Sequence, residues 1–260
     1  PYHPSERYPE TDLRLPLASQ PNAVYAALRQ AFLNLGLDAE RFGTPDWNPL
    51  SVMIRPGDRV LLKPNLIRES HGVLPNQWEQ IITHGSLIRA VLDYAFLALQ
   101  GEGSITIADG PQTDSDFEAI GARLGLGEIC RLYQDTLGFP VELVDLRSER
   151  WVVQGGVVVD RQPLPGDPRG TTLVNLADNS MFAGVARTRP FYGAFYDIEE
   201  TNQSHSNGRH IYAFSRTALE SDVIINLPKL KTHKKAGVTI NLKNLVGLNT
   251  NKNLLPHYTF

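Results

Sequence analysis

Lysine is rare in this chain and is concentrated in one segment. Of seven lysines in 260 residues, six lie between Lys229 and Lys252, and the seventh is Lys63. Arginines, in contrast, are spread along the sequence. Ammonium groups are compact donors that suit phosphate and carboxylate oxygens. The segment therefore predicts an anion-binding loop, and the alternative is a lysine-rich exposed tail.

The lysine segment also contains neutral donors and glycines. Residues 229–247 read KLKTHKKAGVTINLKNLVG, and no acidic residue follows Asp222. Gly237 and Gly247 permit close approach of the backbone to a ligand. The sequence G-x-x-x-x-G-K-[ST] of a Walker A loop is absent. We predict anion-binding residues here and in two earlier segments: Lys63, Asn65, Thr83, Lys229, Lys231, Thr232, Lys243 and Asn244.

Three residues are candidates for catalysis. Asp109 precedes Gly-Pro and could act as a base, hold a metal or bind a ribose hydroxyl, or only begin a turn. His233 lies between lysines, whose charge disfavours its protonated form. His84 precedes a predicted helix whose N-terminal amides could hold an anion. The alternative for His233 is a solvated surface histidine, and for His84 it is a capping turn in which the histidine is incidental. Mg²⁺ needs only one or two carboxylates beside ligand phosphates, so Asp109 is the metal ligand that we predict if the protein uses one.

Apolar runs place these residues at the ends of strands. Strands are predicted at 59–62, 104–108, 141–145 and 223–227, with helices between the first three. Polar residues follow three of these strands: Lys63, Asp109 and Lys229. Alternation of strands and helices predicts a parallel sheet. Ligands bind beyond the carboxyl ends of such strands, so these side chains are expected to converge there.

The predicted fold class is α/β, with a mostly parallel Rossmann-like sheet, helices on both faces and an antiparallel β insertion. Residues 1–20 are predicted to form an extended arm, because they are polar and rich in proline. Residues 21–145 and 211–260 form the predicted α/β domain. Residues 146–210, which contain a Gly-Gly turn between two valine-rich runs, form the predicted antiparallel insertion or cap.

Composition narrows the classes of partner and cofactor. The net charge of −3 and the pI of about 6.2 argue against a nucleic-acid partner. A single cysteine, Cys130, cannot supply a four-cysteine iron–sulfur site. No run reaches the roughly 18 apolar residues of a membrane span, and the N-terminus has no apolar signal core. We therefore expect a cytoplasmic protein without a membrane partner, and the missing initial Met leaves a trimmed start open.

Several motifs together resemble a known family, catalogued as domain of unknown function 362. The resemblance covers about residues 58–247 and implies a Rossmann-like α/β domain of bacteria and archaea. Many members carry ferredoxin-type cysteine clusters, which this chain lacks. Gly85 stands where the family often has proline after Thr-His. The motifs are Leu61-Leu62-Lys63-Pro64-Asn65, Thr83-His84-Gly85, Asp109-Gly110-Pro111, Asn226-Leu227-Pro228-Lys229-Leu230-Lys231-Thr232-His233 and Lys243-Asn244-Leu245-Val246-Gly247.

Two functional hypotheses follow. The first is an enzyme that binds a small phosphorylated or carboxylated metabolite in a lysine-rich crevice and catalyses group transfer, isomerisation or hydrolysis. The second is a non-catalytic accessory protein that binds a cofactor or docks an acidic redox partner. An active site has to be concave and shared with Lys63 and Asp109, whereas a docking patch has to be exposed and convex.

Overall fold

A computed structural model describes residues 2–11, 14–184, 190–192, 197–233 and 237–259. The chain forms two compact units. Unit 1 comprises residues 1–109, 116–144 and 220–244, and unit 2 comprises residues 110–115, 145–219 and 245–260. Lys234 and Lys235 of the lysine segment lie outside the described residues. The division into domains that we predict from the sequence stays a prediction.

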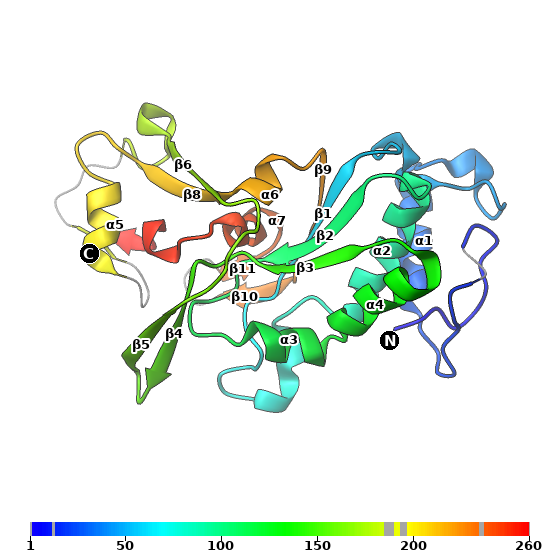
Figure 1. Ribbon diagram of the computed structural model, residues 1–260, viewed down its shortest axis with the longest axis horizontal. Coiled ribbons are helices and arrows are strands. Elements are labelled where there is room, and N and C mark those ends of the chain that lie inside the picture. Colours follow the sequence, from blue (N-terminus) through cyan, green and yellow to red (C-terminus); the bar gives the residue numbers. More distant parts are fainter. Residues whose placement is uncertain (1, 12–13, 185–189, 193–196, 234–236, 260) are drawn as a thin grey trace. The chain divides into compact units, whose positions relative to one another are not determined.

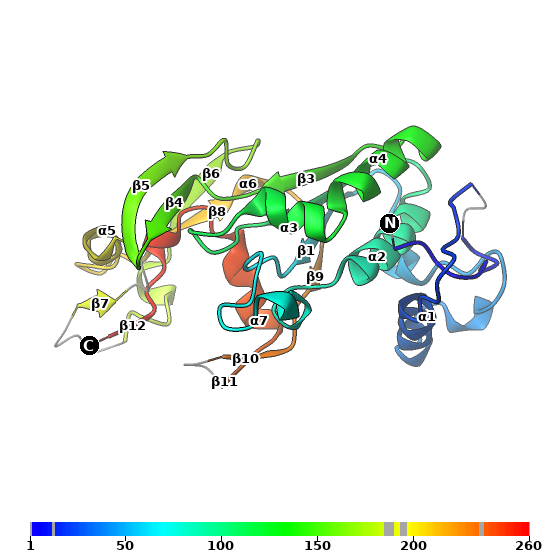
Figure 2. The same ribbon diagram turned by 90° about the horizontal axis from the view of Figure 1, so that it is seen from below.

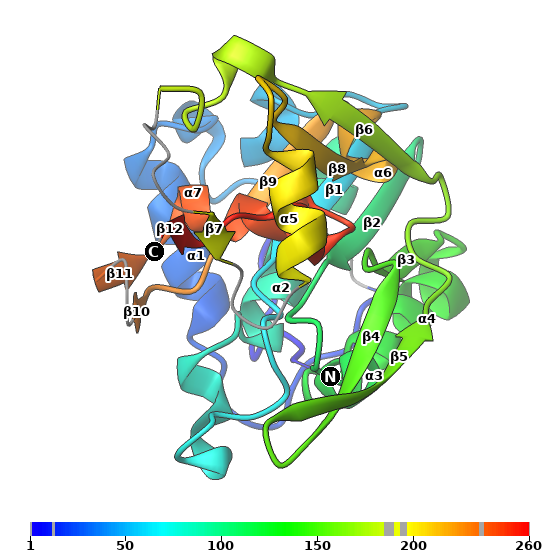
Figure 3. The ribbon, with the colours of Figure 1, turned by 90° about the vertical axis from the view of Figure 1, so that its left-hand side faces the viewer.

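Unit 1 is built on a four-stranded sheet in the order β3-β2-β1-β9, which Figure 3 shows from one side. Its strands are β1 (Arg59–Pro64), β2 (Ser104–Asp109), β3 (Val141–Asp145) and β9 (Val223–Leu227). Strand β1 pairs in parallel with both β2 and β9. The predicted α/β class and parallel sheet are thus confirmed.

The strand order reverses at β1. The chain proceeds from β1 to β2 and β3 on one side and later returns as β9 on the other side of β1. Lys63 of β1 lies beside Asn226 of β9 in the register of this pair. In open α/β sheets, ligands bind at the point where the strand order reverses, outside the carboxyl ends of the strands. The β1–β9 pair therefore defines where a ligand is expected.

Helices pack on the sheet through one continuous apolar core (Figure 1). Val60 and Leu62 of β1 lie beside Ile105 and Ile107 of β2, and all four are fully or almost fully buried. Complete burial of each such side chain stabilises the fold by about 1.5–3 kcal/mol. The helices of unit 1 are α1 (Val24–Asn34), α2 (Gly85–Leu99), α3 (Phe117–Arg123), α4 (Leu126–Leu137) and the short α7 (Asn241–Asn244).

Helix α2 is the central helix of this core. Most of its apolar residues are buried, and Leu87, Phe96 and Leu97 are partly buried. Within the described residues, one helical stretch, Pro75–Leu99, is long and apolar enough to cross a membrane, but 72% of its apolar window is buried in the protein. This burial fits the core helix of a soluble protein.

A buried polar network crosses the core of unit 1 at Asp93 of α2. Its carboxylate accepts hydrogen bonds from Arg89 Nε at 2.8 Å, from the Tyr25 hydroxyl at 2.7 Å and from the Tyr133 hydroxyl. Burial raises the pKa of both tyrosines well above the usual value, so they remain donors. The network joins α1, α2 and α4 and satisfies the carboxylate from three directions.

The lysine segment contains a small antiparallel hairpin of β10 (Lys231–His233) and β11 (Gly237–Thr239), visible in Figure 2. Thr239 Oγ1 donates to the Lys231 carbonyl at 3.2 Å, and Lys231 pairs with Thr239 in the register. The predicted anion-binding loop is therefore part strand. The sequence did not indicate a hairpin here, because the segment mixes lysines with small, polar and apolar residues and has no regular strand pattern.

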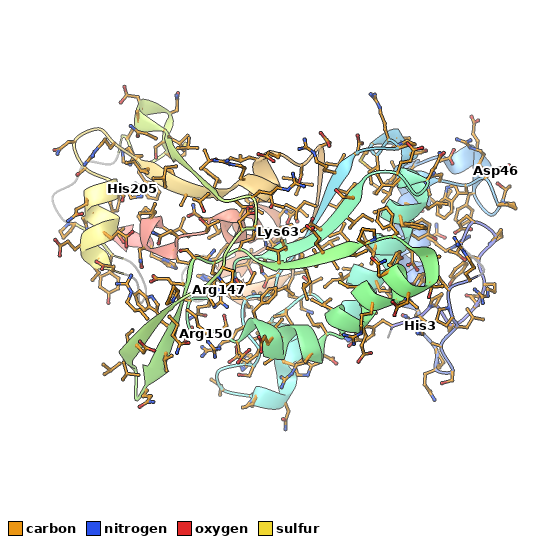
Figure 4. All side chains as sticks on the ribbon, viewed as in Figure 1. His3, Asp46, Lys63, Arg147, Arg150 and His205 are labelled. Carbon is orange, nitrogen blue, oxygen red and sulfur yellow. The ribbon has the colours of Figure 1, made fainter. Side chains whose placement is uncertain are left out.

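Unit 2 contains antiparallel strand pairs, as the predicted insertion requires. The pairs are β4 with β5, β6 with β8 and β7 with β12. Arg147, labelled in Figure 4, is almost fully buried and donates to the carbonyls of Gln112, Thr113 and Ser115. The elements are β4 (Glu149–Gln154), β5 (Val157–Pro163), β6 (Thr171–Asn175), β7 (Phe191–Tyr192), α5 (Ile198–Ser204), β8 (Ile211–Ser215), α6 (Arg216–Leu219) and β12 (Tyr258–Thr259). Short 3-10 helices lie at Ala39–Arg41, Pro49–Val52, Pro75–Gln80, Ala177–Asn179, Leu245–Leu248 and Lys252–Leu254.

Candidate functional site

Thr83 ties together the carboxyl ends of β1 and β9. Its hydroxyl donates to the Leu227 carbonyl at 2.7 Å and accepts from the Asn65 amide at 2.9 Å. Its own amide donates to the Asn65 carbonyl at 2.9 Å. The single hydroxyl hydrogen is thus committed to the backbone, and Thr83 is 2% exposed. Its contacts therefore hold in place the two strand ends beside which a ligand is expected to bind.

Asn244 forms a second tie at the same place. Its amide nitrogen donates to the Lys63 carbonyl at 2.9 Å and to Asn226 Oδ1 at 2.7 Å. Asn226 in turn donates to the Asn241 carbonyl at 3.0 Å. Helix α7 is therefore fixed to the ends of β1 and β9 by side-chain amides.

Lys63 and Asp109 form a buried ion pair at the ends of β1 and β2. Lys63 Nζ lies 2.7 Å from Asp109 Oδ1, and Figure 4 labels Lys63 among packed side chains. Lys63 is 0% and Asp109 4% exposed. Lys63 Nζ also donates to the Pro64 carbonyl at 2.9 Å, and Asp109 Oδ2 accepts from the Leu66 amide at 2.6 Å. Buried charges persist when they are paired in this way.

The pair bears on the predicted metal role of Asp109. Its Oδ1 faces the Lys63 ammonium without a hydrogen-bond partner, and its Oδ2 is bound to a backbone amide. In the described part of the chain, no group of three His, Cys, Asp or Glu side chains is placed to hold a metal. The Lys63 ammonium therefore lies where a cation on this carboxylate would lie, and the present donor set does not fit Mg²⁺.

Lys231 is the lysine that reaches the strand ends from β10. Its Nζ donates to Asn65 Oδ1 at 3.1 Å and to the Ile81 carbonyl at 2.6 Å. Burial lowers the pKa of Lys231 to about 8; Asp109 opposes this shift, and the charges of Lys243 and Lys229 add to it. The neighbouring ammonium groups therefore lie close enough to destabilise one another's charge.

The other predicted cations and His233 lie around Lys231. Lys243 Nζ and His233 Nε2 are 2.9 Å apart, so the imidazole accepts from the ammonium. Thr232, between Lys231 and His233, is exposed. Among the described residues, neither Lys229 nor Lys231 belongs to an ion pair. The charge of Lys229 acts on both Lys231 and His84. Among the charged groups that act on Lys231, the ammonium groups of Lys243 and Lys229 thus outnumber the carboxylate of Asp109.

His84 caps helix α2. Its Nδ1 accepts from the Ser86 amide at 3.2 Å, and the ring stacks on Trp78 at 5.9 Å between centroids. Burial lowers the pKa of His84; Glu79 opposes this shift and Lys229 adds to it. The ring is therefore neutral near pH 7, with Nδ1 as acceptor. The capping turn is thus present, and the histidine itself is the cap rather than incidental to it.

A cavity of about 700 Å³ lies beside the strand ends in unit 1. Its wall includes Thr83, His84 and Lys229 together with residues of the N-terminal segment such as Tyr2 and Asn22. Ligand sites occupy cavities of about 300–1,000 Å³. The cavity thus offers room next to the lysines, bounded by a cation and a neutral imidazole.

The structure brings most of the predicted residues together and adds three. Lys63, Asn65, Thr83, Asp109, Lys231 and Asn244 are linked by the contacts above, and His84 lies at the adjoining cavity. Sequence reasoning missed Asn226, the Ile81 carbonyl and Trp78. Asn226 had a signal, because it lies inside an apolar strand in the motif Asn-Leu-Pro-Lys. A backbone carbonyl has no signal in a sequence.

Comparison with known proteins gives a family and a distant relative. The "Thylakoid-associated protein sll1697" of Synechocystis is 25% identical over 194 residues, which are 75% of this chain and 40% of that protein. The chain thus spans less than half the length of this relative. No solved structure matches.

Residues 153–258 match the family described as "Domain of unknown function (DUF362)". The matched range includes the motifs Asn226–His233 and Lys243–Gly247 and begins after the motifs at Lys63, Thr83 and Asp109. The matching family is thus the one that the sequence motifs resemble, and its match covers residues 153–258 of the chain.

Proposed function

We propose that unit 1 binds a small anionic metabolite, phosphorylated or carboxylated, at the carboxyl ends of β1 and β9, and that the protein is an enzyme acting on it. The observation that carries this proposal is the convergence of Lys229, Lys231 and Lys243 beside a reversal of strand order. Asp109, the carboxylate that acts on Lys231 among the described residues, is already paired with Lys63. An incoming anion would supply the missing negative charge.

Each residue has a role in this proposal. Lys229, Lys231 and Lys243 bind the anion, with Thr232 at the rim. Thr83, Asn65 and Asn244 hold the strand ends and Lys231 in place. Lys63 neutralises Asp109, and His84 and His233 are the neutral imidazoles available for proton transfer. The reaction class remains group transfer, isomerisation or hydrolysis.

One observation favours the accessory-protein alternative. Leu230 and Leu242, which flank the hairpin, are 68% and 85% exposed. Exposed apolar side chains next to lysines are typical of surfaces that dock an acidic partner protein. The burial of Lys231 and the bond between Lys243 and His233 favour the crevice instead, because a docking patch needs free, exposed cations.

Calorimetric titration with inorganic phosphate tests the proposal. Each charge-assisted hydrogen bond is worth about 1.5–3 kcal/mol, so Lys231→Met is expected to weaken binding at least about tenfold. Arg55→Met is the matched control, because this substitution also removes one positive charge. Arg55 is exposed and precedes β1, at the end of the strand opposite to the lysines. Equal affinities of the wild type and Lys231→Met would refute an anion site at Lys231.

We further propose a bacterial protein that works in the cytoplasm. The cyanobacterial relative supports the bacterial origin. That relative's name associates it with thylakoids, so fractionation of cells expressing the full-length protein provides the test. Recovery in the soluble fraction at low salt is expected, and recovery with membranes would refute the cytoplasmic assignment.

A further inference from the structure

We propose that Lys231 is a nucleophile that forms an imine with the carbonyl group of a small anionic carbonyl compound. The imine requires the anion site of the proposed function and names its substrate class: aldehydes or ketones that also carry a phosphate or carboxylate. Lys229 and Lys243 would hold the anionic group while Lys231 reacts.

The two hydrogen bonds of Lys231 leave one direction free. Its Nζ donates to Asn65 Oδ1 and to the Ile81 carbonyl. A neutral amine has two hydrogens, and these two acceptors take both. The lone pair then occupies the remaining tetrahedral position, away from both acceptors. The side chain is thus held in one orientation with its nucleophilic electrons available.

The neutral amine is also populated near neutral pH. Burial, opposed by Asp109 and assisted by Lys243 and Lys229, lowers the pKa of Lys231 to about 8. About one tenth of the amine is then neutral at pH 7, against less than about 0.1% for a lysine with the ordinary pKa of about 10.4. Desolvation and a neighbouring cation are the usual means of activating a lysine for attack on a carbonyl.

The other described lysines lack this combination. Lys63 is fully buried in its ion pair with Asp109. Lys252 is buried in unit 2 and donates to the Asn249 carbonyl at 2.7 Å. Lys243 donates to the imidazole of His233, and Lys229 lines the neighbouring cavity. Lys231 alone among the described lysines joins partial access, two orienting acceptors and adjacent cations.

The reaction balances without an oxidant or reductant. The lone pair of Lys231 Nζ attacks the carbonyl carbon, and the carbon–oxygen π electrons move to oxygen. Protonation of that oxygen and loss of the two nitrogen hydrogens release one water molecule and leave a carbon–nitrogen double bond. Water reverses the step. A protonated imine withdraws electrons from the adjacent carbon, which suits isomerisation or group transfer at that carbon.

Reductive trapping on the full chain tests the imine. Dihydroxyacetone phosphate and uncharged dihydroxyacetone are incubated separately with the protein and sodium cyanoborohydride, which delivers hydride to the imine carbon. Peptide mass mapping then compares all seven lysines. We expect at least about tenfold more adduct on Lys231 than on any other lysine, and at least about tenfold faster labelling by the phosphate ester. Even labelling across exposed lysines, or equal rates for the two probes, would overturn the proposal.

Lys231→Arg separates the imine from the anion site. The variant keeps a cation but lacks a primary amine, so it should lose the adduct on this peptide, while phosphate binding is measured on the wild type. If the wild type binds phosphate but gives no Lys231 adduct, the imine is wrong and the anion site stands. If the wild type shows neither, both proposals fail. The wild-type peptide map decides the matter even if the variant does not fold.

Discussion

Replacing Thr83 by valine tests whether one hydroxyl holds the ends of β1 and β9 together. Valine has nearly the same shape but cannot donate to the Leu227 carbonyl or accept from the Asn65 amide. A buried polar group left without a partner costs about 1–3 kcal/mol. Because Asn65 is only partly buried, we expect the two groups together to destabilise unit 1 by about 2–4 kcal/mol.

The measurement is urea unfolding followed by circular dichroism, with a thermal scan beside it. At about 2–4 °C per kcal/mol for a chain of this size, Tm should fall by roughly 4–16 °C. Thr83→Ser is the control, since it keeps both hydrogen bonds and loses one methyl group, worth about 0.8 kcal/mol. A valine variant within about 0.5 kcal/mol of the wild type, or a serine variant as unstable as the valine variant, would refute the role of the hydroxyl.

Three further perturbations have defined outcomes. Sulfate, whose charge is constant in this pH range, should bind more weakly as pH rises through about 8, because Lys231 loses its proton there. Calorimetric titration of Lys231→Arg should show no such change of affinity with pH. If the change persists in this variant, Lys231 is not its cause. His84→Ala should cost about 1 kcal/mol through loss of the helix cap, with His84→Asn as the retaining control. Because the folded pKa of His84 lies below its unfolded value of about 6.5, the cap should stabilise the fold above that pH and be lost as pH falls, so urea midpoints for His84→Ala and the wild type should converge in acid. Asp93→Ala should cost about 3–5 kcal/mol, because it leaves the buried Arg89 unpaired, and a loss below about 1 kcal/mol by urea unfolding would contradict the network.

The strands were the most predictable part of the structure. Buried parallel strands are short apolar runs, and the run at 223–227 is observed as β9 with the same bounds. The hairpin of β10 and β11 was not predicted, because its strands, Lys-Thr-His and Gly-Val-Thr, have three residues each and contain no apolar run. Short strands are set by pairing across the hairpin rather than by a local pattern.

The meeting of Lys63, Asp109 and Lys229 at one end of the sheet was predictable, but the pairing among the candidate residues was not. Parallel strands end at one edge, so Lys63, Asp109 and Lys229 could be assigned to that edge from the sequence alone. Which cation neutralises Asp109 depends on distances of a few ångströms, and Lys63 rather than Lys231 is the partner at 2.7 Å. Likewise, the acceptors of Lys231 include a backbone carbonyl, whose position only the fold determines.

The parallel pairing of β1 with β9 has a consequence for synthesis. Val60 pairs with Val223, so β1 keeps one open edge until more than 160 further residues have been made. At about 5–20 residues per second, this interval lasts roughly 8–32 s. An unpaired edge of a strand that contains Leu61 and Leu62 is a template for pairing with other chains. The sheet is therefore completed late on the ribosome, and a stalled nascent chain exposes the edge of β1 along which β9 would later pair.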